Sequence, residues 1–311
     1  MCQTILRNVR RGTWSRPRDV EPPVRRLHLL VGTAAAALLI GSCGAGDTDV
    51  ATDEPPPPTD GYEHPTDPEA VVLRISDEGG FVPEEQTFVG APRLLITGDG
   101  RLIQGGPVIA IYPGPLLPNL LQRSINEAGI QRLIQLADEQ GLLADVTYTR
   151  PTNIADAADT VVTITVGGET FEHRAYALGL GGGPDGGETD ESRARLFDFA
   201  VAATDLVSDP ESGELGPEQP YSGDTYMIRA REAGDTEPTD GPPIDIIEPT
   251  AVDWPADALV RLAAAGECAE VPTNRFSELF ENANQLTRFV DAGVPYSLAV
   301  TPRLPGRSCP S

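Results

Sequence analysis

The residues Val162-Thr163-Ile164-Thr165-Val166-Gly167-Gly168 carry the pattern of a β-strand followed by a turn. Apolar and polar side chains alternate over its first five residues, which is the period of a strand with one buried face. The two glycines then permit the positive φ of a tight turn, so residues 170–178 are expected to return as the second strand of a hairpin. Such a hairpin is stable only when other elements cover its apolar face.

Two segments beside the hairpin have the spacing of helices that supply this cover. Residues 126–140 carry apolar side chains at helical spacing, with Ser124 and Glu127 as an expected capping box and Gly141 as a C-terminal stop. Residues 189–207 repeat the pattern with several alanines and two phenylalanines. The sequence therefore predicts two helices on one face of a sheet.

The preceding part of the chain supplies further strands. Residues 71–75 alternate as in a half-buried strand, and residues 93–104 read as a hairpin around an Asp-Gly turn. Residues 108–112 and 119–125 are expected to form two more strands. Residues 69–209 are thus predicted to form an α+β domain in which one antiparallel sheet packs on two helices.

A second, smaller α+β domain is expected over residues 223–311. Residues 210–222 are polar and rich in Pro, Gly and Glu, as in a linker. Beyond them, residues 226–231 have the pattern of a strand. Trp254 follows, and its place beside a proline favours a core role.

The last eighty residues predict helices and one hairpin. Residues 258–265 are expected to form a short helix, and Asn274 is expected to cap a second helix with an apolar stripe over residues 276–283. Residues 286–290 either continue that helix or pair with residues 296–300. The Asp-Ala-Gly sequence between them favours the hairpin.

The N-terminal region carries the pattern of an export signal. Arg25 and Arg26 precede an apolar run over residues 29–40, which is shorter than the roughly 17–25 residues that a membrane-spanning helix needs. The stretch Ile40-Gly41-Ser42-Cys43 resembles the lipobox of bacterial lipoproteins, and this resemblance implies removal of residues 1–42 and a diacylglycerol thioether on Cys43 with an acylated, palmitate-bearing amino group. A plain secretory signal and an uncleaved anchor are the alternatives, and Val24 is a second candidate start.

Composition limits the partners of the chain. All 23 basic residues are Arg, and the formal net charge is −24. Without residues 1–42, which hold seven Arg and two acids, 16 Arg stand against 45 Asp and Glu, a charge of −29. Such a surface repels phosphate backbones, so nucleic-acid binding is not expected. No cofactor is predicted either, and attachment to the membrane is expected through the lipid alone, at the outer face of the cell membrane.

Residues 43–68 are predicted to be a disordered tether between the lipid and the folded part. They contain four consecutive prolines, many acids and no Arg, and they lack apolar periodicity. His64 lies in this segment and is expected to be inert.

Two cysteines are left for structure once Cys2 is removed with the leader and Cys43 is acylated. In an exported protein, Cys268 and Cys309 are expected to form a disulfide. A two-cysteine metal site is the rival, but neither thiol has a His or a further Cys nearby in the sequence.

No set of catalytic or metal-binding residues is recognisable. His173 alternates with apolar neighbours on a strand, which favours a structural or surface role, and the Gly-rich residues 179–187 lack the Lys of a phosphate-binding loop. Phe81 and Tyr112 are the candidate partner-binding residues, because each follows or precedes Gly and Pro residues that stiffen its backbone. The sequence favours a non-enzymatic binding protein over a secreted hydrolase that uses carboxylates or His173.

The order of these motifs resembles known protein families. The Gly79-Gly80-Phe81 turn after the first strand, the helix ending at Gly141-Leu142-Leu143 and the hairpin with His173 are similar to uncharacterised secreted lipoproteins of high-GC actinobacteria. Over residues 70–207 the same order resembles emfourins, small inhibitors of bacterial metalloproteases. This resemblance implies an extracytoplasmic protease inhibitor as an alternative function. The chain departs from it at Val82-Pro83, and residues 223–311 have no counterpart there.

Overall fold

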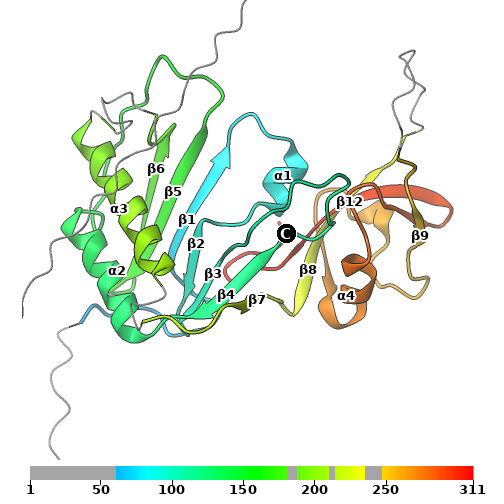
Figure 1. Ribbon diagram of the computed structural model, residues 1–311, viewed down its shortest axis with the longest axis horizontal. Coiled ribbons are helices and arrows are strands. Elements are labelled where there is room, and N and C mark those ends of the chain that lie inside the picture. The colour runs from blue at the N-terminus through cyan, green and yellow to red at the C-terminus, as the bar shows by residue number, and fades with distance from the viewer. Residues whose placement is uncertain (1–60, 181–187, 189, 210–213, 235–246, 311) are drawn as a thin grey trace, which may run out of the picture. The chain divides into compact units, whose positions relative to one another are not determined.

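Figure 1 shows a computed structural model of the protein, which describes residues 61–180, 188, 190–209, 214–234 and 247–310. Within these residues the chain forms two β-sheets, four α-helices and one short 3-10 helix. The α+β class predicted from the sequence is confirmed. The signal peptide, Cys43 and most of the expected tether lie outside the described residues.

The first sheet has seven antiparallel strands in the order β6-β5-β1-β2-β3-β4-β7. The predicted hairpin forms its β5-β6 edge, with Val162 opposite His173 and the turn at Gly167 and Gly168. The strands are β1 (Val71–Gly79), β2 (Leu94–Thr97), β3 (Arg101–Gly105), β4 (Leu120–Ser124), β5 (Ala158–Val166), β6 (Glu169–Tyr176) and β7 (Gln219–Pro220).

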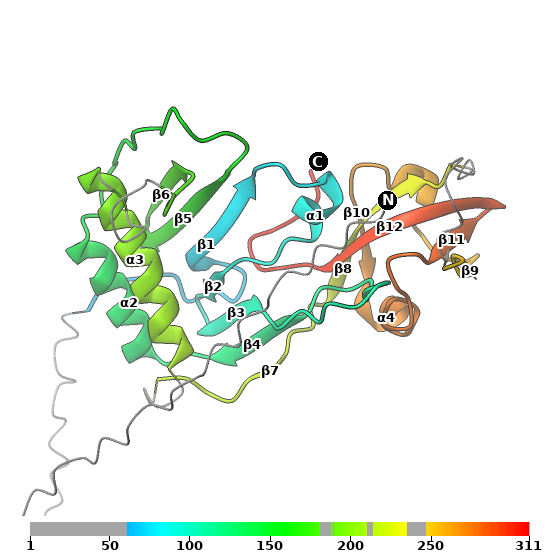
Figure 2. The ribbon, with the colours of Figure 1, turned by 45° about the horizontal axis from the view of Figure 1, so that its top comes forward.

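Helices α2 (Glu127–Glu139) and α3 (Glu191–Ser208) lie side by side on one face of this sheet (Figures 1 and 2). Their buried side chains form one core with alternate residues of the strands, as the 3.6-residue spacing predicted. The expected capping box is absent: Ser124 pairs with Arg101 in the sheet, and Asn126 caps α2 by accepting a hydrogen bond from the Gly129 amide. Gly141 ends the helix at a φ of 70°.

The opposite face of the first sheet is covered by distant parts of the chain. Leu95 and Ile103 pack there against Tyr221 and Leu304, which is 3% exposed. Part of the expected linker, residues 210–222, therefore belongs to the first sheet, since β7 pairs with β4 and Tyr221 is buried beside it. The residues after Pro57 cluster into one compact unit that contains both sheets.

The strand expected at residues 108–112 does not form. β3 ends at Gly105, and residues 106–111 have no regular structure. Pro107 lacks the amide that a ladder needs, and the Asn119 side chain binds its carbonyl at 2.9 Å, which turns the chain away from the sheet. The apolar side chains of this segment face solvent instead of a core.

The second sheet has five strands in the order β10-β8-β12-β11-β9. Only the β9-β11 pair is parallel. The β11-β12 pair is the predicted hairpin, so the alternative of a continued helix is wrong. The strands are β8 (Thr225–Glu232), β9 (Ala251–Asp253), β10 (Ala269–Pro272), β11 (Arg288–Asp291) and β12 (Val294–Pro302).

Aromatic side chains fill the core between this sheet and helix α4 (Thr273–Glu281). Trp254 is 4% exposed and stacks on Phe276 with 4.8 Å between ring centroids, as its predicted core role requires. Asn274 does not cap α4, because the helix already begins at Thr273. The helix expected at residues 258–265 is reduced to the 3-10 turn η1 (Leu262–Ala264).

The folded part begins earlier than the sequence indicated. Residues 61–68 were expected to belong to the tether, yet Tyr62 donates a hydrogen bond from its hydroxyl to Asp138 of α2 at 2.7 Å. His64 lies 3.1 Å from the Glu127 carboxylate at the start of the same helix, so it belongs to the ordered part of the chain. These contacts lie far apart in the sequence, where local polarity gives no sign of them.

Candidate binding surface around helix α1

The structure leaves Phe81 almost fully exposed, at 90% of its surface. The turn before it has positive φ at Gly79 (72°) and Gly80 (82°), a conformation that glycine adopts without strain. The Phe81 amide donates a hydrogen bond to the Asp156 carbonyl at 3.1 Å, which fixes the backbone. An apolar ring is thus held in water on an anchored turn.

Tyr112, the second predicted binding residue, lies in the apolar loop, which we define as residues 107–113. Its side chain is 70% exposed, and the loop's other exposed apolar side chains are Val108 (87%), Ile109 (62%) and Ile111 (56%). Two hydrogen bonds fix the end of the loop to Gln285, which precedes β11 of the second sheet. The Gln285 amide donates to the Gly114 carbonyl, and the Gly114 amide donates to the Gln285 side chain. Soluble proteins rarely expose so many neighbouring apolar side chains without a binding role.

Helix α1 (Glu84–Val89) follows Phe81 closely in the chain, and sequence reasoning missed it. Pro83 separates it from Val82, and this proline followed by Glu84 and Glu85 is a helix-start signal. With only six residues and one buried side chain, Phe88, the helix has too little periodicity to detect.

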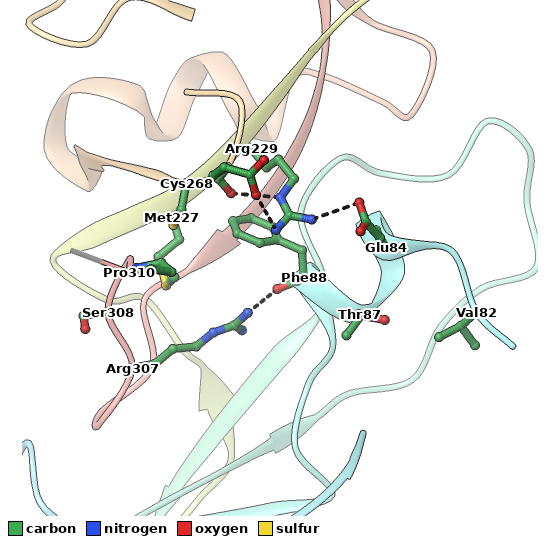
Figure 3. Close-up of a pocket in the computed structure, with 11 residues that line it drawn as sticks. Val82, Glu84, Thr87, Phe88, Met227, Arg229, Cys268, Arg307, Ser308 and Pro310 are labelled. Atoms are coloured by element: carbon green, nitrogen blue, oxygen red, sulfur yellow. Dashed lines mark hydrogen bonds and ion pairs between the residues drawn. The ribbon is translucent and has the colours of Figure 1, made fainter. Parts of the chain in front are cut away.

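Phe88 is the contact through which α1 joins the second sheet. Its ring packs against Met227 of β8 and Ala299 of β12. Figure 3 shows the ring between two guanidinium groups, and their central carbons lie 5.0 Å (Arg229) and 5.6 Å (Arg307) from the ring centroid. Both contacts have the distance of a cation–π interaction.

Ion pairs add to this attachment. Glu84, in the first turn of α1, lies 3.6 Å from Arg229, and Glu85 lies 2.8 Å from Arg231 of β8. The Arg307 guanidinium donates a hydrogen bond to the Phe88 carbonyl at 2.6 Å (Figure 3). Helix α1 is therefore held to β8 and to the C-terminal segment by charged as well as apolar contacts.

Cavities surround the helix on several sides. One of about 450 Å³ contains Phe88 and Arg229 in its lining, and a second of about 590 Å³ lies between α1 and β1. A third, of about 390 Å³, is lined by Pro83 and by Gln285, which also lines a cavity of about 420 Å³ beneath the apolar loop. Residues of α1 and of the apolar loop thus line cavities that share Gln285, while Phe81 and Tyr112 themselves line none of these four cavities.

His173 is a structural residue. It is 1% exposed, and its Nε2 donates to the Leu142 carbonyl at 2.8 Å while its Nδ1 accepts from the Tyr148 hydroxyl at 2.8 Å. Burial lowers the pKa of His173, so the imidazole is neutral at pH 7. Both ring nitrogens are therefore occupied by hydrogen bonds within the fold.

The predicted disulfide between Cys268 and Cys309 is present, with 5.5 Å between the Cα atoms. It connects Cys268, the residue before β10, with the C-terminal segment, which we define as residues 303–310, and it packs beside Phe88. Among the described residues no group of three or more His, Cys, Asp or Glu is placed to hold a metal ion. No helix in the described part of the chain is long and apolar enough to span a membrane.

Comparison of this chain with protein-family models, with curated proteins and with solved structures finds no match.

Proposed function

We propose that this protein is a lipid-anchored protein of the cell envelope that binds a protein partner outside the cell and catalyses no reaction itself. The anchor is Cys43, freed by removal of a signal peptide over residues 1–42. Two or more acyl chains give a lasting attachment where one chain does not. The sequence favours an extended tether after Cys43, and the first described contacts with the folded part begin at Tyr62.

The observation that carries the binding role is the exposure of apolar side chains on anchored backbone. Phe81 is 90% and Tyr112 70% exposed, and both lie in segments whose backbone is fixed by hydrogen bonds. Little conformational entropy is lost when such side chains bind a partner, because their backbone is already ordered. Exposed aromatic side chains of this kind are also those that dominate binding energies at protein interfaces.

The proposal is tested by photo-crosslinking in the cell that makes the protein. The chain has no Lys, so amine-directed reagents have no side chain to modify. A photoreactive phenylalanine analogue is placed instead at position 81 or 112, and at Leu259, which is 97% exposed, as the matched control. We expect the first two positions to give the same discrete adduct and the control position to give none.

Mass spectrometry of that adduct then identifies the partner. An extracellular metalloprotease in the adduct would assign the inhibitor role that the resemblance to emfourins implies. Adducts of equal yield from all three positions would show that exposure alone causes crosslinking, and the binding surface proposed here would be rejected.

A further inference from the structure

The arginines of the described chain fall into two groups. Most form an ion pair with Asp or Glu, as expected in a chain with 47 acidic residues. Within the described residues the exceptions are Arg74, Arg150, Arg288 and Arg307, and Arg150 stacks on the Tyr176 ring at 3.7 Å. Arg74 and Arg307 line the same cavity of about 590 Å³ between α1 and β1.

Arg74 projects from the sheet face that α2 and α3 leave uncovered. It lies opposite Leu95 in the ladder, and Leu95 packs on that face against Leu304. The Arg74 Nε–H is buried and has no hydrogen-bond partner within the described chain. A buried donor without a partner is unfavourable, and no acceptor of the described chain holds the Arg74 guanidinium at its Nε.

Arg307 is held at the cavity because the residues before it and after it in the chain are both anchored. Leu304 is buried on the first sheet, and a turn with Gly306 at a φ of 72° brings the Arg307 amide 3.1 Å from the Leu304 carbonyl. Cys309, two residues further on, is held by the disulfide. One guanidinium nitrogen donates to the Phe88 carbonyl, and guanidinium has five N–H donors in all.

The acids at this cavity already have cationic partners. Both Asp77 oxygens accept hydrogen bonds from Arg93, each at 2.6 Å. Glu78 accepts from Arg174 at 2.8 Å. The charges of Arg74 and Arg307 are therefore not neutralised from within the cavity.

The direction of the pKa shift of Arg307 agrees with two cationic side chains at one cavity. Burial and the nearby charges of Arg74 and Arg229 lower the pKa of Arg307, and no carboxylate raises it. The guanidinium stays protonated even so, because an arginine side chain keeps its proton throughout the physiological pH range. Like charges that line one partly buried cavity repel each other, and an anion bound there offsets the repulsion.

We propose that the cavity between α1 and β1 binds an organic monocarboxylate whose oxygens accept hydrogen bonds from Arg74 and Arg307. Guanidinium groups match carboxylate geometry and bind it with two parallel hydrogen bonds. Val82, Ala91 and Pro92 form apolar wall beside the arginines and suit the short hydrocarbon part of such a ligand. The net charge of −24 repels a dianion more than a monoanion, which disfavours phosphate.

This inference depends neither on the lipid anchor nor on Phe81. The test uses the full-length protein in detergent, titrated with sodium propionate against sodium chloride at constant ionic strength. Binding is followed by calorimetry and by the NMR signals of the arginine Nε–H groups. We expect saturable binding that shifts the Arg74 signal, and an affinity at least about tenfold lower in Arg74→Gln and in Arg307→Gln.

Arg288→Gln is the matched control, because Arg288 also has no carboxylate partner among the residues that the structure describes and does not line the cavity. It is expected to bind propionate as the unchanged protein does. If Arg74→Gln does not fold, Arg74→Lys keeps the charge and removes the Nε–H. Three results would overturn the proposal: no saturable propionate binding, an equal loss in Arg288→Gln, or inorganic phosphate bound as tightly as propionate.

Discussion

Replacing Phe88 with alanine is expected to lower the free energy of unfolding by about 3–5 kcal/mol. The ring is 7% exposed and packs against Met227 and Ala299 of the second sheet. Its removal deletes these apolar contacts and both guanidinium–ring contacts, and it leaves a space that the short helix cannot fill. The expected loss is therefore that of a fully buried aromatic side chain.

The effect should be concentrated at α1 because nothing else of comparable strength holds it. The helix has six residues, no side-chain hydrogen bond at its N-cap, and no other buried side chain. Helices this short are not stable in water on their own. Its surface ion pairs with Arg229 and Arg231 are each worth at most about 1 kcal/mol.

Urea unfolding measures the total loss, and hydrogen exchange at the amides of residues 84–90 locates it. Phe81→Ala is the matched control, because it removes the same side chain seven residues earlier where the ring is 90% exposed. That control is expected to stay within about 0.5 kcal/mol of the unchanged protein. A Phe88→Ala variant as stable as the control would contradict the assigned role of Phe88.

Replacing Glu188 with alanine is expected to cost about 3–5 kcal/mol, because it leaves a buried charge without its partner. The side chains of Glu188 and Arg193 are each 2% exposed, and two hydrogen bonds of 2.7 and 2.8 Å join them. Glu188 also accepts from the Gly179 amide at 2.7 Å. The pair thus ties the end of the β5-β6 hairpin to the start of α3.

Glu191→Ala is the control for this change. Glu191 pairs with Arg195 at 3.8 Å on the exposed side of the same helix, with 86% of its side chain in solvent. Such pairs contribute about 0.3–0.5 kcal/mol. Thermal and urea unfolding measure the free energy of unfolding of both variants. Equal losses would show that the buried Glu188–Arg193 pair stabilises the fold no more than an exposed pair does.

The Glu188–Arg193 pair is also expected to make the stability of the protein depend on pH in the acidic range. The hydrogen bond from Arg193 lowers the pKa of Glu188 below its ordinary value, against the opposing effect of burial. Its contribution is therefore complete above the unfolded-state pKa of about 4.3 and is lost as the pH falls through the lower folded-state pKa. Below pH 4, Glu188→Ala should lose less stability on further acidification than the unchanged protein does.

The elements that sequence reasoning predicted correctly are those whose pattern is local. Helix α2 and the β5-β6 hairpin carry apolar residues at a clear period and end at glycines with positive φ, so their neighbours in sequence suffice. The disulfide was predictable because only Cys268 and Cys309 were left to pair. Phe81 and Tyr112 are predicted to bind a partner because nearby Gly and Pro residues stiffen their backbone, and both side chains are exposed.

The failures come from contacts between distant parts of the chain. Residues 108–112 have the composition of a buried strand, but they pair with no strand of the described chain, so composition alone gave the wrong prediction. The order of residues 61–68 depends on side chains of α2 that lie more than sixty positions later. Arg74 and Arg307 line one cavity only because the C-terminal segment crosses the first sheet. No local sequence pattern predicts this crossing.

The proposed function depends on where the protein is held. A binding surface at α1 has its proposed role outside the cell only if the chain is exported and fixed there through Cys43. Trypsin gives a direct readout of both events, since the chain has no Lys and no Arg between Arg26 and Arg74. A processed chain releases a first peptide that spans residues 43–74, and an unprocessed chain releases one that spans residues 27–74.

Mass spectrometry of the trypsin-cut protein from the membrane fraction is therefore the decisive measurement. We predict a peptide of residues 43–74 that carries a diacylglycerol thioether on Cys43 and an acyl chain on its amino group. A peptide of residues 27–74, or residues 43–74 with a free thiol, would contradict the anchor and the function built on it.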